Sequence, residues 1–161
     1  MRVGDIVLIT GTIYTSRDAA HKRMLEMIDN GEELPFKIED AIIYYVGPTP
    51  AKPGYTIGSA GPTTSYRMDE YASAFLDMGL SGMIGKGERE PQVWDAIVKN
   101  SAVYFAAIGG AGALIAECVV DSKVVAFEDL QSEAVRKLTI KDILKTLQEL
   151  MHRKALTCLR K

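Results

Sequence analysis

Short apolar runs alternate along the chain with longer stretches whose apolar residues recur every three or four positions. Short runs rich in β-branched residues are typical of strands, and the longer spacing is typical of amphipathic helices. The pattern predicts strands over residues 3–9, 41–46, 83–84, 102–108, 123–127 and 134–140. It predicts helices from Thr15 or Ser16 to Asn30-Gly31, over 64–78, from Pro91, over 113–118 and over 142–153.

Residues 47–62 interrupt this alternation with four prolines and four glycines. A loop of this length is uncommon inside a compact domain unless it has a function. The segment has no charge run and no serine repeat of the kind found in linkers, and the chain on both sides is well patterned. We therefore predict an ordered loop that shapes a site, and no domain boundary.

The order of the elements predicts the fold class. Strands and helices alternate at first, and two strands then follow each other near the end. This order favours an α/β fold with a mixed, layered sheet over a doubly wound parallel sheet. The 161 residues suffice for a single domain with its own core. We predict that domain over residues 1–141, and a C-terminal amphipathic helix with a basic tail over residues 142–161.

The composition excludes several classes of protein. Lys and Arg number 19 against 21 Asp and Glu, a net charge of -2, so no basic excess points to nucleic acid. No apolar run is long enough for a membrane span, and the first ten residues lack a signal-peptide pattern. Cys118 and Cys158 have neither a metal-ligand spacing nor a disulfide framework. We expect a cytoplasmic protein.

Two arginines lie in predicted first turns of helices, where helix polarity disfavours a cation. Arg17 and Arg67 each follow hydroxyl residues suited to helix capping. Helix N-termini attract anions, and a planar guanidinium group matches a carboxylate or a phosphate. One anionic ligand bound by both would explain their placement. The alternative is a pair of surface arginines that reach water, with Asp18 complementing the helix dipole and His21 packed as an ordinary helix residue.

Two glycine-rich segments follow later strands. Lys86 lies between two glycines in GMIGKG, where the backbone can approach a ligand closely. GGAG at residues 109–112 lacks the full dinucleotide-binding pattern, so a tight turn is the simpler interpretation and a nucleotide-binding domain the alternative. The chain has two histidines and two cysteines. It therefore offers groups that bind an anion without a ligand set for a metal cofactor.

Four segments together resemble a known family. GTIYTSRDAAHKR (11–23), GPTTSYRMD (61–69), GMIGKG (82–87) and YFAAIGGAGAL (104–114) are similar, in the same order, to segments of the β subunit of class I fumarate hydratases. L-tartrate dehydratase β subunits and the C-terminal half of single-chain iron–sulfur fumarases share them. The resemblance covers about residues 3–140 and implies a swivelling β/β/α domain. Beyond residue 140 the family continues with a strand, whereas the periodicity here predicts a helix.

The resemblance also implies a cofactor and site residues. In that family an α subunit carries a 4Fe-4S cluster on three cysteines, and the active site lies between the two parts. By the same resemblance, Arg17 and Arg67 hold the dicarboxylate and Lys86 contacts a carboxylate. Thr63 matches the candidate base for the proton on carbon, and Thr64 the neighbouring hydroxyl that binds substrate. The supporting positions are Asp18, which would orient Arg17, and His21.

The resemblance therefore implies the β subunit of an iron–sulfur hydro-lyase that interconverts fumarate and L-malate. We expect it to be inactive alone, to bind no metal itself and to form a hetero-oligomer with an α subunit, without nucleic-acid or membrane partners. One alternative is an L-tartrate dehydratase β subunit, since one substrate hydroxyl separates the two reactions. A second is a non-catalytic module for carboxylate binding or assembly.

Overall fold

The computed structural model describes residues 4–147. No helix among them is long and apolar enough to cross a membrane. The strands are β1 (Ile6–Thr15), β2 (Ile42–Tyr44), β3 (Gly82–Gly85), β4 (Val103–Ala106), β5 (Val119–Ala126) and β6 (Val135–Leu147). The α-helices are α1 (Asp18–Asp29), α2 (Asp69–Asp77), α3 (Pro91–Lys99) and α4 (Gly112–Glu117), and the 3-10 helices are η1 (Ser65–Met68) and η2 (Glu128–Glu133).

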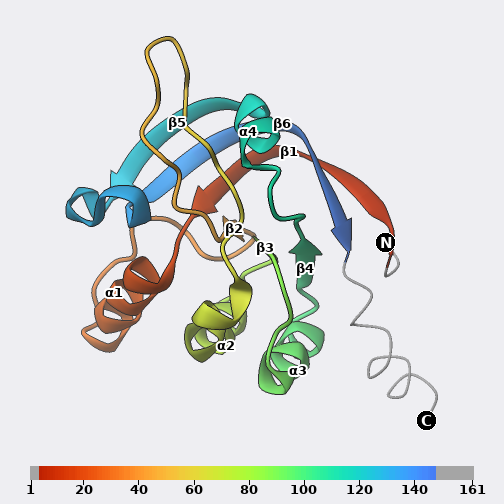
Figure 1. Ribbon diagram of the computed structural model, residues 1–161. Helices are drawn as coiled ribbons and strands as arrows, with labels where there is room; N and C mark the ends of the chain where they lie inside the picture. The colour runs from red at the N-terminus through yellow and green to blue at the C-terminus, as the bar shows by residue number, and fades with distance from the viewer. Residues whose placement is uncertain (1–3, 148–161) are drawn as a thin grey trace.

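The strands form one mixed six-stranded sheet within the described residues, in the order β1-β2-β3-β4-β6-β5. Strands β1 to β4 run parallel, and β6 pairs antiparallel with β4, β5 and β1. The pairing of β6 with β1 closes the sheet on itself. In Figure 1, β1, β5 and β6 arch across one side, while α1, α2 and α3 lie in a row on the other.

Two apolar cores separate three layers. Alternate residues of β2, β3 and β4 point to opposite faces, as the two-residue period of a strand requires. Tyr44 and Ile84 pack in the core between the strand layers, and Ile43 and Met83 pack in the core beneath the helices. Each large side chain fully buried in this way contributes about 1.5–3 kcal/mol to stability. These layers confirm the predicted α/β class with a β/β/α arrangement and a mixed sheet.

Several boundaries differ from the prediction. Strand β1 continues through Thr10 and Gly11 to Thr15, so α1 begins at Asp18. The predicted helix over 64–78 begins instead as the 3-10 turn η1. Arg67 therefore lies in the last turn of η1, and acidic residues occupy the first turn of α2. The prediction of an unfavourably placed cation is thus wrong at Arg67, while Arg17 lies at the N-cap position of α1.

The helix predicted to begin at residue 142 is wrong over residues 142–147, which belong to β6. The predicted boundary at 141/142 falls inside this strand. A bulge explains the misleading spacing: Ile9 pairs with Ile143 and Gly11 with Ile140, so β6 holds one extra residue there. Ile140 and Ile143 consequently both point into the core, three positions apart as in a helix. The basic tail and the remainder of the predicted helix, residues 148–161, lie outside the described residues.

Candidate functional site

The carboxyl ends of four parallel strands bring the predicted segments to one edge of the sheet. Arg17 follows β1, Gly47 follows β2, Lys86 follows β3 and Gly109 follows β4. In α/β sheets this edge is where ligands characteristically bind, because the loops there project beyond the strands. This edge therefore brings together candidate binding residues that are spread over about ninety positions of the sequence.

Arg17 and Arg67 meet around one carboxylate. Arg17 Nε lies 3.6 Å from Asp18 Oδ1, and Arg67 Nη1 lies 3.8 Å from Asp18 Oδ2. The arginine side chains are 20% and 47% exposed, so both remain accessible from solvent. Two guanidinium groups that share one carboxylate retain donors for another anion.

Arg17 is also held by a residue from the far end of the chain. Glu133, at the end of η2, places Oε1 3.2 Å from Arg17 Nη2, and its Oε2 accepts a 3.1 Å hydrogen bond from the backbone N–H of Ala19. A carbon added at Gly47 would come within 2.8 Å of Arg17 Nη1, so the arginine packs directly over that glycine. Sequence reasoning missed Glu133, because an acid in a polar turn 116 residues away carries no local sign of this contact.

His21 lies in the core and does not face solvent. It is 1% exposed, and its ring packs against two tyrosines and a phenylalanine. Burial lowers its pKa to about 4, so the ring is neutral near pH 7. Nδ1 lies 2.9 Å from the carbonyl oxygen of Arg17 and 2.7 Å from Ser16 Oγ. Since a carbonyl only accepts, Nδ1 carries the proton, and His21 supports the backbone next to Arg17.

Backbone pairing brings the two threonines beside the lysine. Thr64 and Lys86 form a parallel bridge, in which Lys86 N–H donates to the Thr63 carbonyl and Ser65 N–H donates to the Lys86 carbonyl. All three predicted side chains are half-buried. The side chain of Lys86 passes over Gly109, with Nζ 4.0 Å from the position of an added Cβ. Thr64 is also the N-cap of η1, which links this group to Arg67.

A buried polar network lies beneath these threonines. Ser65 Oγ is 2.8 Å from the hydroxyl of Tyr104, which donates to the Gly87 carbonyl at 2.9 Å. Burial raises the pKa of Tyr104 to about 12, so this hydroxyl keeps its proton. Gly85 is required here, because a Cβ would lie 2.0 Å from Ser65 Oγ. The network therefore fixes the backbone on both sides of Lys86.

Arg89 completes this network. Its side chain is 0% exposed, and its Nε lies 2.5 Å from Asp69 Oδ1. The guanidinium also lies 5.3 Å from the ring centres of both Tyr45 and Tyr104. The Glu90 N–H donates to the other oxygen of Asp69 at 2.7 Å. Arg89 was missed because its sequence neighbours, GERE, resemble an exposed charged turn.

Comparison with known proteins identifies the family. A family model described as the C-terminus of fumarase matches residues 1–148. The chain belongs to this family. It is 42% identical over 142 residues to fumarate hydratase 2 of Leishmania major and 43% identical over 136 residues to the anaerobic class I fumarate hydratase of Escherichia coli. These alignments cover 87% and 83% of this chain but 25% of each relative.

A third relative is matched by this chain over most of its length. A Methanocaldococcus jannaschii protein named as a candidate L(+)-tartrate dehydratase β subunit is 38% identical over 145 residues, covering 87% of this chain and 74% of that protein. The chain thus spans about a quarter of the fumarate hydratases that it matches and about three quarters of this relative. The resemblance to fumarase and tartrate dehydratase β segments is therefore confirmed.

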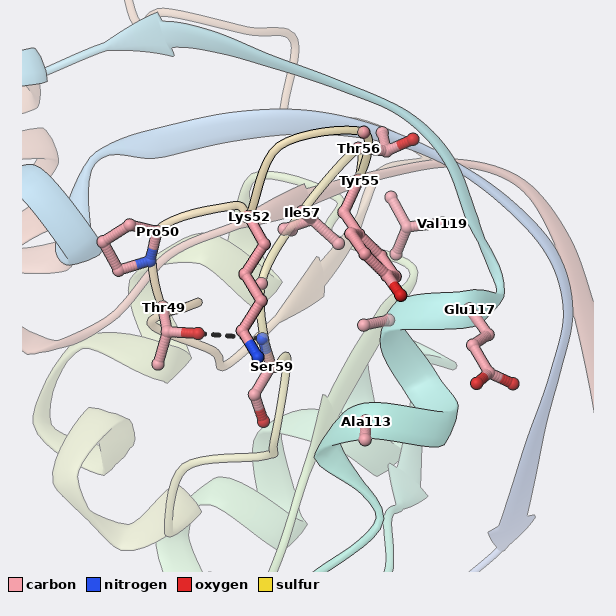
Figure 2. A pocket seen from close by; sticks show the side chains of 13 residues that line it. Thr49, Pro50, Lys52, Tyr55, Thr56, Ile57, Ser59, Ala113, Glu117 and Val119 are labelled. Atoms are coloured by element: carbon pink, nitrogen blue, oxygen red, sulfur yellow. Dashed lines mark hydrogen bonds between the residues drawn. The ribbon is translucent and has the colours of Figure 1, made fainter.

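In this fumarase C-terminal domain the long Gly/Pro-rich loop, residues 47–62, lines a pocket that lies apart from the predicted site residues. The loop is ordered, with Thr49 and Ser59 joined by two hydrogen bonds across it. Together with α4 it encloses a pocket of about 530 Å³, over which Tyr55 leans toward α4 (Figure 2). The residues around this pocket include none of the seven predicted site residues. The prediction of an ordered loop is correct, and the pocket is separate from the predicted site residues at the carboxyl ends of the parallel strands.

The donor set described for this fumarase C-terminal domain does not fit an iron–sulfur cluster. Across residues 4–147, no three His, Cys, Asp or Glu side chains gather in a metal-binding group. Cys118 is the one cysteine in that range, and it is half-buried and free. Protein-bound clusters are held by several cysteine thiolates.

Proposed function

We propose that this chain supplies the substrate-carboxylate-binding residues of a hydro-lyase that interconverts fumarate and L-malate. The observation that carries the proposal is the meeting of Arg17 and Arg67 around Asp18, at the sheet edge that also holds Lys86 and the two threonines. The comparisons support the choice of reaction, since relatives at about 40% identity are fumarate hydratases.

The charges of this edge suit a small dianion. Fumarate and malate each carry two carboxylates, and the edge offers two guanidinium groups and one ammonium group. Arginine binds a carboxylate through two parallel hydrogen bonds, whereas lysine acts as a point charge. We assign Arg17 and Arg67 to carboxylate binding and Lys86 to a further carboxylate contact.

Thr63 and Thr64 are assigned to the reacting carbons. Thr64 binds substrate through its hydroxyl, and Thr63 is the candidate catalytic residue that exchanges the proton on carbon. A free hydroxyl is a weak base near neutral pH and needs a neighbouring positive charge that stabilises its deprotonated form. We assign this role to Lys86, whose backbone N–H donates to the Thr63 carbonyl.

A partner chain completes the proposed site. We infer that an α subunit carries the 4Fe-4S cluster, because the described donor set of this chain does not fit one and because one relative is named as a β subunit. The cluster would supply the Lewis acid that activates the substrate hydroxyl. Three large apolar side chains are at least 60% exposed, and we assign them to contacts with this partner: Tyr66 beside Arg67, Ile108 after β4 and Leu114 in α4.

L-tartrate dehydration is the second candidate. One relative is named for that reaction. This chain covers 74% of that relative's length, against about a quarter of the fumarate hydratases. Tartrate differs from malate by one hydroxyl, so the same carboxylate-binding residues serve both substrates. A polar group that pairs with this hydroxyl would select between the two substrates.

The test is an anaerobic assay of this chain with its cluster-bearing partner on fumarate, malate and tartrate in parallel. Arg17→Ala and Arg67→Ala should each lower kcat/KM by about tenfold to a hundredfold, because each removes a charge-assisted contact. Lys22→Ala, an exposed change on α1, is the matched control. Wild-type kinetics in both arginine variants would contradict the proposed site, and activity of this chain alone would contradict the need for a partner.

A further inference from the structure

We propose that Glu133 is a positioning residue that holds Arg17 in the orientation needed to bind a substrate carboxylate. The proposal rests on the function proposed above, in which Arg17 contacts substrate. Glu133 comes from η2, a segment that none of the predicted site motifs includes.

The Glu133 carboxylate binds Arg17 and the start of its helix at once. Oε1 lies 3.2 Å from Arg17 Nη2, and Oε2 accepts the Ala19 N–H at 3.1 Å. The first backbone N–H groups of a helix have no partner within the helix, so this acceptor also caps α1. Because both contacts use one carboxylate, the guanidinium is fixed relative to the backbone from which it extends.

Asp18 alone does not fix this orientation. Its Oδ1 lies 3.6 Å from Arg17 Nε, beyond a normal hydrogen bond, and neither buried atom has a hydrogen-bond partner. The Glu133 contact is the shorter of the two ion pairs. The guanidinium also lies against Gly47, and the Ser132 carbonyl lies 3.3 Å from where a Cβ of Gly47 would be. Arg17 thus contacts both Glu133 of η2 and the segment that follows β2.

The η2 segment has its own attachment to α1. Arg23 donates two hydrogen bonds to Asp129, at 2.8 and 2.9 Å, and its guanidinium lies 4.9 Å from the ring centre of Phe127. This attachment does not involve Arg17, so a substitution of Glu133 leaves η2 anchored. Asp129→Asn keeps one acceptor oxygen for Arg23 and removes a negative charge from the same η2 segment, so it provides a matched control.

Glu133→Gln removes the ion pair with Arg17 and keeps the hydrogen bond with the Ala19 N–H. A glutamine has one acceptor oxygen, which the Ala19 N–H can use, and its NH2 group then faces the guanidinium without an attractive contact. We expect KM for malate in the assembled enzyme to rise about tenfold and kcat to stay within about twofold, because the change weakens a binding residue. Asp129→Asn should leave both constants within about twofold of wild type.

A double-mutant cycle shows whether Glu133 acts through Arg17. In an Arg17→Ala background, Glu133→Gln should leave KM unchanged, since the group that it positions is gone. Equal effects of Glu133→Gln in both backgrounds, or a fall in KM, would overturn the proposal. If Arg17→Ala itself leaves KM unchanged, the proposed function fails instead.

A second measurement needs no activity. In 1H–15N spectra of the full chain, the Arg17 Nε–H resonance should move toward the position of free arginine in Glu133→Gln and stay in place in Asp129→Asn. An unchanged Arg17 resonance in Glu133→Gln would show that Glu133 does not hold the side chain.

Discussion

Substituting Asp69 by asparagine tests whether the buried ion pair between Asp69 and Arg89 supports the turn that carries Lys86. The Arg89 side chain is fully buried and Asp69 is 4% exposed, so loss of the carboxylate charge leaves a cation in the core without its ionic partner. Removing one member of a buried pair costs roughly 3–5 kcal/mol. For a domain of this size that loss lowers Tm by roughly 6–20 °C.

The assay is urea unfolding followed by fluorescence of Trp94, the chain's single tryptophan, whose ring centre lies 5.8 Å from that of Tyr104. Asp77→Asn is the matched control at the other end of α2, because Asp77 forms an exposed pair with Lys99, and its loss should change the free energy of unfolding little. Equal losses of unfolding free energy in the Asp69 and Asp77 variants would refute the reasoning.

Two further predictions concern residues around Arg17. Burial lowers the pKa of His21 from 6.5 to about 4, so the unfolded chain binds the proton first and stability falls as pH drops through this range, by up to about 3 kcal/mol. His21→Gln should flatten this fall in urea titrations at several pH values between the two pKa values, and an equal slope in the variant would contradict it. Gly47→Ala should displace Arg17, since its Cβ would lie 2.8 Å from Nη1, and raise KM for malate about tenfold. Gly61→Ala, where the nearest atom is 3.7 Å away, should leave KM unchanged, and equal KM values in the two alanine variants would show that Arg17 tolerates the added methyl group.

Local signals predicted the inner strands and two of the helix limits well. The unbroken apolar run at residues 41–46 predicts a strand buried on both faces, and its members do alternate between the two cores. Asn30-Gly31 and Pro91 mark a helix end and a helix start, because their backbone preferences act within one turn. Such features depend on neighbours in sequence, so a single sequence reveals them.

Features set by tertiary pairing could not be predicted. The extension of β6 through residues 142–147 depends on its partner β1, and the extra residue opposite Thr10 gives the strand a helix-like spacing. The contact of Glu133 with Arg17 joins residues 116 positions apart. Arg89 lies in a charged sequence but is buried between two tyrosines, because Asp69 neutralises it there.

Helix polarity points to both Arg17 and Arg67, but the structure supports that reason only at Arg17. At Arg17 the positive charge does lie at a helix N-terminus, but two internal carboxylates, Asp18 and Glu133, offset the unfavourable polarity. At Arg67 no such conflict exists, because η1 ends there before α2 begins. The assignment of Arg67 therefore rests on the family motifs and not on helix polarity.

The balance of charge at the carboxyl edge argues for a shared site. The edge carries three cations, Arg17, Arg67 and Lys86, and the two arginines pair with two carboxylates, Asp18 and Glu133, so the surplus is one positive charge. A dicarboxylate brings two negative charges, so binding to this edge alone leaves an excess of one negative charge. In a partly buried site that excess is costly unless a further positive group compensates it. If the chain acts as proposed, the carboxylates that orient the arginines therefore leave part of the substrate charge to be neutralised by other groups, such as cationic side chains of the proposed partner.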